Sequence, residues 1–131
     1  MVIVDTTVWV DYLRGTRNAE TDWLDGQMDR QRIGLTDLIL CEVLQGMRDD
    51  KAFSRVKTEL LSFAIFENGG NEVAIAAAQN FRLLRERGVT VRKTIDCLIA
   101  TFCIRAHHTL LHRDRDYDAF EKQLGLTVIH A

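Results

Sequence analysis

The sequence predicts an α/β protein with a mainly parallel central sheet of about five strands. Short apolar runs alternate along the chain with longer segments whose apolar residues recur at helical spacing. The first run, Val2–Val4, is continuous rather than alternating, which is typical of a parallel strand buried on both faces. The chain contains no Pro and no low-complexity linker, and its 131 residues are enough for one domain with a hydrophobic core.

The first half of the chain provides three strands and the helices between them. The opening strand is followed by a helix over Val8–Leu13, for which Thr6 or Thr7 is the expected cap. Gly69 and Gly70 mark the turn at the end of this half. Between these points we expect a helix over Ala19–Asp29, a strand over Arg32–Leu35, a helix from Thr36 or Asp37 to about Arg48, a helix over Asp50–Phe63 and a strand over Ala64–Glu67.

The second half of the chain alternates in the same way. Asn71 is the expected cap of a long Ala-rich helix over Glu72–Arg87, and Gly88 stands just past its end. Thr94 is the expected cap of the next helix, which continues to His107. The remaining segments are a strand over Thr109–His112, a loop over Arg113–Asp118, a short helix over Tyr117–Leu124 closed by Gly125, and a strand over Leu126–Ile129.

Asp5 comes directly after the first strand, so we expect its carboxylate at the carboxyl end of a central strand. Ligands of open α/β sheets bind at this edge, which makes Asp5 a candidate for chemistry. The alternative is that Asp5 only caps the helix that follows. The opening stretch by itself supports both interpretations equally.

Four further acids are expected at the same edge of a parallel sheet. Asp114 and Asp116 follow the fourth strand, Asp96 lies in the first turn of its helix, and Glu42 lies in the first two turns of the helix after the second strand. Carboxylates that share a small site raise one another's pKa values unless a cation is bound. A set of oxygen ligands selects Mg²⁺ or Mn²⁺ over zinc. The alternative for Asp96 is that it only complements the helix dipole.

The net charge of −2 excludes a generically basic nucleic-acid binder but not a local basic patch. Such a patch lies between residues 82 and 93, where five cations stand against Glu86 alone. The helix dipole accounts for Arg82 and Arg85. Arg92 and Lys93 lie beyond the helix and are therefore candidates for contacts with phosphate groups.

Two features of the sequence predict a soluble, cytosolic protein without a membrane anchor. No run of about 18 apolar residues occurs, and no charged leader precedes a cleavable apolar segment. The three cysteines are odd in number and have no paired spacing, which argues for a reducing compartment.

Four segments resemble the PIN-domain ribonucleases and, within that family, the VapC toxins of bacterial toxin–antitoxin pairs. The resemblance covers essentially the whole chain in order. The segments are VIVDTTVWVDYLRG over Val2–Gly15, LILCEVLQG over Leu38–Gly46, TIDCLIA over Thr94–Ala100 and LLHRDRDYDAF over Leu110–Phe120.

The resemblance implies a single PIN domain over residues 1–131 with a three-layer α/β/α fold. It also implies a homodimer that is inhibited by a VapB-like antitoxin, with which it forms a heterotetramer or a larger assembly. In the family the final acid varies between two positions, here Asp114 and Asp116, so the division of roles between them stays open. The catalytic and metal-binding set that the resemblance implies is Asp5, Glu42, Asp96, Asp114 and Asp116, with Thr7 as a polar neighbour that supports Asp5.

The function that follows from the acids and the resemblance is a Mg²⁺- or Mn²⁺-dependent endoribonuclease that cleaves tRNA or another structured RNA and so inhibits translation and growth. Activation of water for in-line attack on the phosphodiester predicts products with a 5′-phosphate. We expect Arg92, Lys93 and Arg113 to contact the RNA. The alternative is a non-catalytic PIN-like module that binds RNA or a protein partner with the same rim.

The antitoxin is expected to use apolar surface that the sheet leaves uncovered. We predict that one of its helices binds around Trp9, Trp23, Leu44 and Phe53. A basic side chain of the antitoxin, an Arg, would then lie near the acids and compete with the metal for them.

Overall fold

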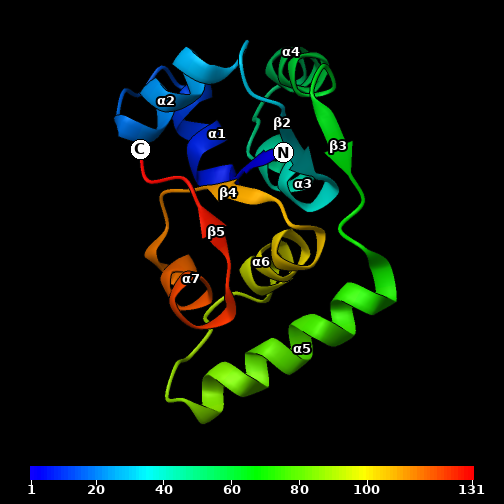
Figure 1. Ribbon diagram of the computed structural model, residues 1–131. Helices are drawn as coiled ribbons and strands as arrows, with labels where there is room; N and C mark the ends of the chain where they lie inside the picture. The colour runs from blue at the N-terminus through cyan, green and yellow to red at the C-terminus, as the bar shows by residue number, and fades with distance from the viewer.

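The computed structural model describes residues 1–131 and confirms the predicted α/β architecture (Figure 1). Five strands form one sheet in the order β3-β2-β1-β4-β5, and every neighbouring pair is parallel. The strands are β1 (Val2–Val4), β2 (Ile33–Thr36), β3 (Ala64–Phe66), β4 (Thr109–Leu111) and β5 (Thr127–Val128).

Helices fill each connection between consecutive strands. None of them has both the length and the apolar character needed to cross a membrane. They are α1 (Thr6–Leu13), α2 (Ala19–Gln27), α3 (Asp37–Gln45), α4 (Asp50–Leu60), α5 (Gly70–Glu86), α6 (Thr94–Ala106), the 3₁₀ helix η1 (Arg115–Tyr117) and α7 (Asp118–Leu124).

The strand order divides the helices between the two faces of the sheet. Figure 1 shows α1, α2 and α4 on one side and α5, α6 and α7 on the other, and α3 contacts both α1 and α4. The chain runs outward from β1 to β2 and β3, then returns through α5 and α6 to β4 on the other side of β1. This reversal creates a switch point between β1 and β4, where parallel α/β sheets open a crevice at the carboxyl ends of the strands.

The central strand β1 is buried as its continuous apolar run predicts. Ile3 and Val4 have no exposed surface, and β1 pairs with β2 on one side and β4 on the other. The backbone N–H of Asp5 donates to the carbonyl oxygen of Leu111 at 2.9 Å, so the first residue after β1 is tied to the end of β4. The sheet itself therefore carries Asp5 to the switch point.

The first turns of α5 and α6 differ from the prediction. Gly69 precedes α5 with a φ of 107°, and the helix begins at Gly70, so Asn71 is not its cap. Only glycine adopts this left-handed backbone readily, which is why the start of the helix is set by the Gly pair. Lys93 precedes α6 without a side-chain cap, and Thr94 is the first helical residue.

The prediction that a partner binds an apolar surface around Trp9, Trp23, Leu44 and Phe53 is partly wrong. Trp9 has no exposed surface, because its indole packs against Phe63, with ring centroids 5.1 Å apart, and against Tyr12. Trp23 and Leu44 are half-buried, and Phe53 is 39% exposed. Trp9 is therefore not accessible to a partner, whereas the other three side chains keep some exposed surface.

Candidate functional site

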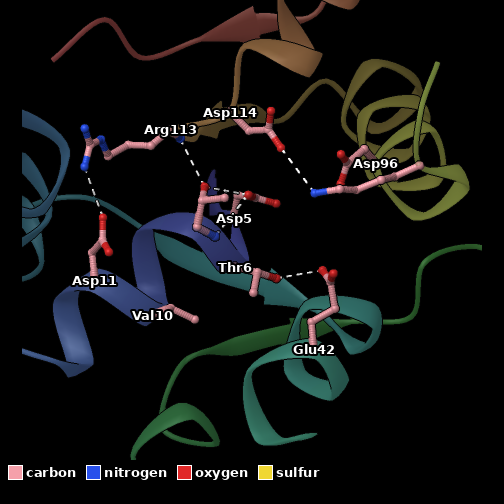
Figure 2. A pocket seen from close by; sticks show the side chains of 10 residues that line it. Asp5, Thr6, Val10, Asp11, Glu42, Asp96, Arg113 and Asp114 are labelled. Carbon is pink, nitrogen blue, oxygen red and sulfur yellow. Dashed lines mark hydrogen bonds and ion pairs between the residues drawn. The ribbon is translucent and has the colours of Figure 1, made fainter. Parts of the chain in front are cut away.

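An open cleft of about 500 Å³ lies at the carboxyl ends of β1 and β4 (Figure 2). Its walls come from α1, α3, the start of α6 and the loop after β4, and only one of the ten lining residues is hydrophobic. The lining residues are Asp5, Thr6, Thr7, Val10, Asp11, Glu42, Lys93, Asp96, Arg113 and Asp114.

Asp5 both caps the helix α1 and lies in the cleft, which are the two interpretations that the sequence left open. It caps α1, because its Oδ2 accepts from the backbone N–H of Thr7 at 3.1 Å, and Thr6 and Thr7 lie inside the helix rather than at its cap. The same Oδ2 accepts from the Thr7 hydroxyl at 2.7 Å, and Oδ1 accepts from the Tyr117 hydroxyl at 2.8 Å. The carboxylate also lines the cleft. Capping and a position in the site are therefore compatible for this residue.

Asp96 is the acid whose surroundings are least favourable to its charge. It lies in the first turn of α6, is 6% exposed, and its Oδ2 has no hydrogen-bond partner. Burial, followed by the negative charge of Asp5, raises its pKa to about 7, although the Lys93 ammonium opposes the shift. A buried carboxylate with a free oxygen is a natural ligand for a cation.

Glu42 reaches the cleft from α3 and is held by a hydroxyl from α1. Thr6 Oγ1 donates to Glu42 Oε1 at 2.7 Å, and Figure 2 draws this contact as a dashed line. Burial and the charge of Asp5 raise the pKa of Glu42, while the hydrogen bond from Thr6 lowers it. Thr6 therefore holds an acid that lies 36 residues away along the chain.

Asp114 and Asp116 lie on the loop after β4 and face different cations. The Lys93 ammonium is 3.7 Å from Asp114 Oδ2, and Arg92 donates to Asp116 Oδ1 at 2.9 Å. Asp114 lines the cleft, whereas Asp116 is absent from its walls. Even so, one oxygen from each of Asp96, Asp114 and Asp116 lies within 4.8 Å of the others, so these three acids can hold a divalent cation.

Arg113 joins the cleft to the helices α1 and α2. Its Nη1 is 3.2 Å from Asp11 Oδ2 and its Nε is 3.4 Å from Glu20 Oε2, and its backbone N–H donates to the Thr7 hydroxyl at 3.1 Å. Arg92, Lys93 and Arg113 are therefore all ion-paired with acids at or beside the cleft.

Three polar residues of the site were not assigned to it from the sequence. Thr6 was considered only as a helix cap, and Asp11 and Tyr117 were not considered as site residues. The α1 helix brings Asp11 onto the cleft one turn after Thr7, which helical spacing predicts once the helix start is known. Tyr117 lies 112 residues from Asp5, and no local pattern predicts that contact.

The arrangement as a whole has the chemistry of a site for a hard divalent cation. The donors are carboxylate oxygens, several are crowded together, and Asp96, which lines the cleft, has one oxygen without a hydrogen-bond partner. The clustered side chains that could hold an ion are all Asp, with no Cys or His among them, which disfavours zinc.

Comparison with known proteins identifies the family of the chain. The family described as PIN domain matches residues 2–123 of the chain. Ribonuclease VapC11 from Mycobacterium tuberculosis and a VapC ribonuclease from Mycobacterium bovis are each 31% identical to this chain over 129 residues, covering 96% of both sequences.

Several solved structures share the fold of this chain. FitAcB from Neisseria gonorrhoeae has a TM-score of 0.78 at 22% identity and covers 99% of this chain and 97% of its own. VapBC2 from Rickettsia felis, solved bound to a DNA fragment from its promoter, has a TM-score of 0.76 at 17% identity and covers 98% of both chains. The chain therefore belongs to the PIN-domain family and, within it, to the VapC ribonucleases.

Proposed function

We propose that this protein is a Mg²⁺- or Mn²⁺-dependent endoribonuclease and the toxin of a toxin–antitoxin pair. The observation that carries the proposal is the unpartnered Oδ2 of buried Asp96 in a cleft of acids. Burial of so much negative charge opposes folding, and a function at this site would account for the cost. Membership of the VapC ribonucleases identifies that function as cleavage of RNA.

Several carboxylates of the cleft together bind the cation. The ligands are Asp5, Glu42, Asp96 and Asp114, with Asp116 beside them. We assign the main fourth position to Asp114 because it lines the cleft, while Asp116 is held by Arg92 and is absent from the walls. Thr7 supports the first ligand through two hydrogen bonds to Asp5 Oδ2.

When bound, the cation supplies positive charge that lowers the pKa of the attacking water and stabilises negative charge at the phosphate. In-line attack breaks the bond between phosphorus and the 3′ oxygen, so one product carries a 5′-phosphate and the other a 3′-hydroxyl. The chain's own contribution is to hold the carboxylates in a fixed orientation. Thr6 does this for Glu42, and Thr7 and Tyr117 do it for Asp5.

Basic residues at the rim are proposed to receive the RNA. Arg92, Lys93 and Arg113 lie beside the acids, where a phosphate backbone must pass to reach the cleft. The cations of their ion pairs with Asp116, Asp114 and Asp11 are between 43% and 69% exposed, so exchanging these pairs for phosphate contacts requires little energy. We propose tRNA or another structured RNA as the substrate.

A VapB-like antitoxin is the proposed partner, and a homodimer of the toxin that joins it in a heterotetramer or larger complex is the proposed assembly. The related structure from Rickettsia felis is named VapBC2, that is, a VapB and a VapC together. The apolar surface around Trp23, Leu44 and Phe53 is the proposed docking place for an antitoxin helix. An Arg of the antitoxin near Asp5 and Asp96 would compete with the metal.

This function can be tested by brief expression in bacteria, followed by sequencing of RNA ends. We expect new 5′-phosphate ends at a defined site with the wild type and none with Asp5→Asn, which keeps the size of the side chain and removes its charge. Asp25→Asn is the matched control, since Asp25 lies outside the acidic cleft and should keep full activity. Equal cleavage by wild type and Asp5→Asn would reject the proposal and favour a non-catalytic binding module.

A further inference from the structure

Tyr117 places a neutral hydroxyl between two acids of the cleft. Its side chain has no exposed surface, and its hydroxyl donates to Asp5 Oδ1 at 2.8 Å. The same hydroxyl oxygen is 3.4 Å from Asp96 Oδ1. A phenol has one proton, and the shorter distance shows that Asp5 receives it.

The loop that carries Asp114 also fixes Tyr117. Asp114 Oδ1 accepts from the backbone N–H of Asp116 at 2.9 Å, and the Asp114 carbonyl accepts from the backbone N–H of Tyr117 at 3.1 Å. The ring of His112 packs on the Tyr117 ring with centroids 4.8 Å apart. The phenol therefore has little freedom to leave its position between the acids.

The hydrogen bonds of the two acids are strongly unequal. Both oxygens of Asp5 accept hydrogen bonds, from Tyr117 on one side and from Thr7 on the other. Asp96 has only the long contact with the phenol, and its Oδ2 has no partner. One acid is thus fixed in orientation, while its neighbour keeps an oxygen free for a ligand.

We propose that Tyr117 is a positioning residue of the metal site: without lining the cleft itself, it holds the Asp5 carboxylate in the orientation for metal binding. This inference rests on the proposed function, because it assigns a role toward the metal. Phe at position 117 would fill the same volume but leave Asp5 Oδ1 without its donor. The carboxylate would then be free to turn, and loss of such a supporting hydrogen bond typically weakens metal affinity 10–100-fold.

The chain provides a matched control for removal of the hydroxyl. Tyr12 is the only other tyrosine. Its hydroxyl lies 4.0 Å from Met28 Sδ and is not part of the acidic cleft. Tyr12→Phe therefore makes the same chemical change away from the acids.

The test is isothermal titration of the purified full chain with Mn²⁺, comparing wild type, Tyr117→Phe and Tyr12→Phe. We expect a Kd increased about 10–100-fold for Tyr117→Phe and within twofold of wild type for Tyr12→Phe. At saturating Mn²⁺ the KM for RNA should stay within twofold in both variants, because a buried phenol does not touch RNA. An unchanged or tighter Kd for Tyr117→Phe would overturn the inference. Failure of the wild type to bind Mn²⁺ would instead reject the proposed function.

A second measurement does not depend on how well Tyr117→Phe folds. Incorporation of 3-fluorotyrosine labels both tyrosines, and the Tyr12→Phe background identifies the signal of Tyr117. We expect addition of Mg²⁺ to shift the ¹⁹F resonance of Tyr117 and to leave that of Tyr12 in place. A Tyr117 resonance that does not respond, in a protein that binds Mg²⁺, would also overturn the inference.

Discussion

Replacement of Asp96 by Asn removes one negative charge from the most crowded part of the cleft. Burial and the charge of Asp5 raise the pKa of Asp96 from 3.8 to about 7, so the native state binds this proton more tightly than the unfolded chain does. In metal-free protein the ionisation of Asp96 therefore opposes folding. The loss of stability begins as the pH rises above about 4 and is complete above about 7.

The magnitude follows from the two pKa values. Each pKa unit corresponds to about 1.4 kcal/mol, so the ionised Asp96 lowers the free energy of unfolding by up to about 4 kcal/mol at pH 8. Asn removes this term but places an amide N–H₂ where Asp96 Oδ2 has no partner, which costs about 2 kcal/mol. The expected net gain is about 2 kcal/mol, or about 8 °C in Tm for a chain of this size.

Thermal unfolding in EDTA and in Mn²⁺ measures both effects. In EDTA at pH 8 we expect Asp96→Asn to melt about 8 °C above wild type. At pH 4, where Asp96 is protonated, the order should reverse by a similar amount, because only the unsatisfied amide remains. A Mn²⁺ concentration 100 times the Kd should stabilise wild type by about 2.7 kcal/mol, and the variant should not respond.

Two results would refute this reasoning. If Asp96→Asn melts below wild type in EDTA at pH 8, the charge of Asp96 does not oppose folding. If the variant gains as much stability from Mn²⁺ as wild type does, Asp96 is not a ligand. Asp25→Asn, with its charge outside the cleft, should shift Tm by less than about 2 °C in either condition.

Three further predictions concern other parts of the molecule. Replacing Arg92 and Lys93 together by Ala should reduce the slope of log K against log salt for RNA binding by about 1.4–1.8, measured by fluorescence anisotropy. An unchanged slope would show that neither cation contacts phosphate. Gly34→Ala should lower the free energy of unfolding by about 1–3 kcal/mol in urea, because a Cβ would lie 2.9 Å from the backbone carbonyl oxygen of Ala64, which the neighbouring strand β3 holds in place; an unchanged midpoint would contradict this packing. Thr6→Val should weaken Mn²⁺ affinity about tenfold by releasing Glu42, and an unchanged Kd would contradict that role.

The sequence was sufficient to predict the fold because its local signals agree. The continuous run Val2–Val4 predicted the central strand, and it occupies that place between β2 and β4. Segment types and order followed from apolar periodicity. Errors arose at helix starts, where several residues can cap. At α1 the carboxylate of Asp5 competes with Thr6 and Thr7, and only the backbone geometry decides between them.

The site was less accessible to sequence reasoning than the fold. The strand ends and the resemblance led to Asp5, Glu42, Asp96 and Asp114, which line one cleft. The phenol of Tyr117 was missed because its role depends on a contact across 112 residues. Hydrogen-bond partners at such separations are set by the packing of the whole sheet.

The most direct test of the central claim is a Mn²⁺ titration in which metal binding and cleavage of a defined RNA are measured on the same purified protein. If the acids of the cleft form the metal site of a ribonuclease, the cleavage rate should rise in proportion to Mn²⁺ occupancy. It should vanish in EDTA and in Asp5→Asn, and the products should carry 5′-phosphate ends. Cleavage that persists in EDTA, or products that end in a 2′,3′-cyclic phosphate, would contradict the account.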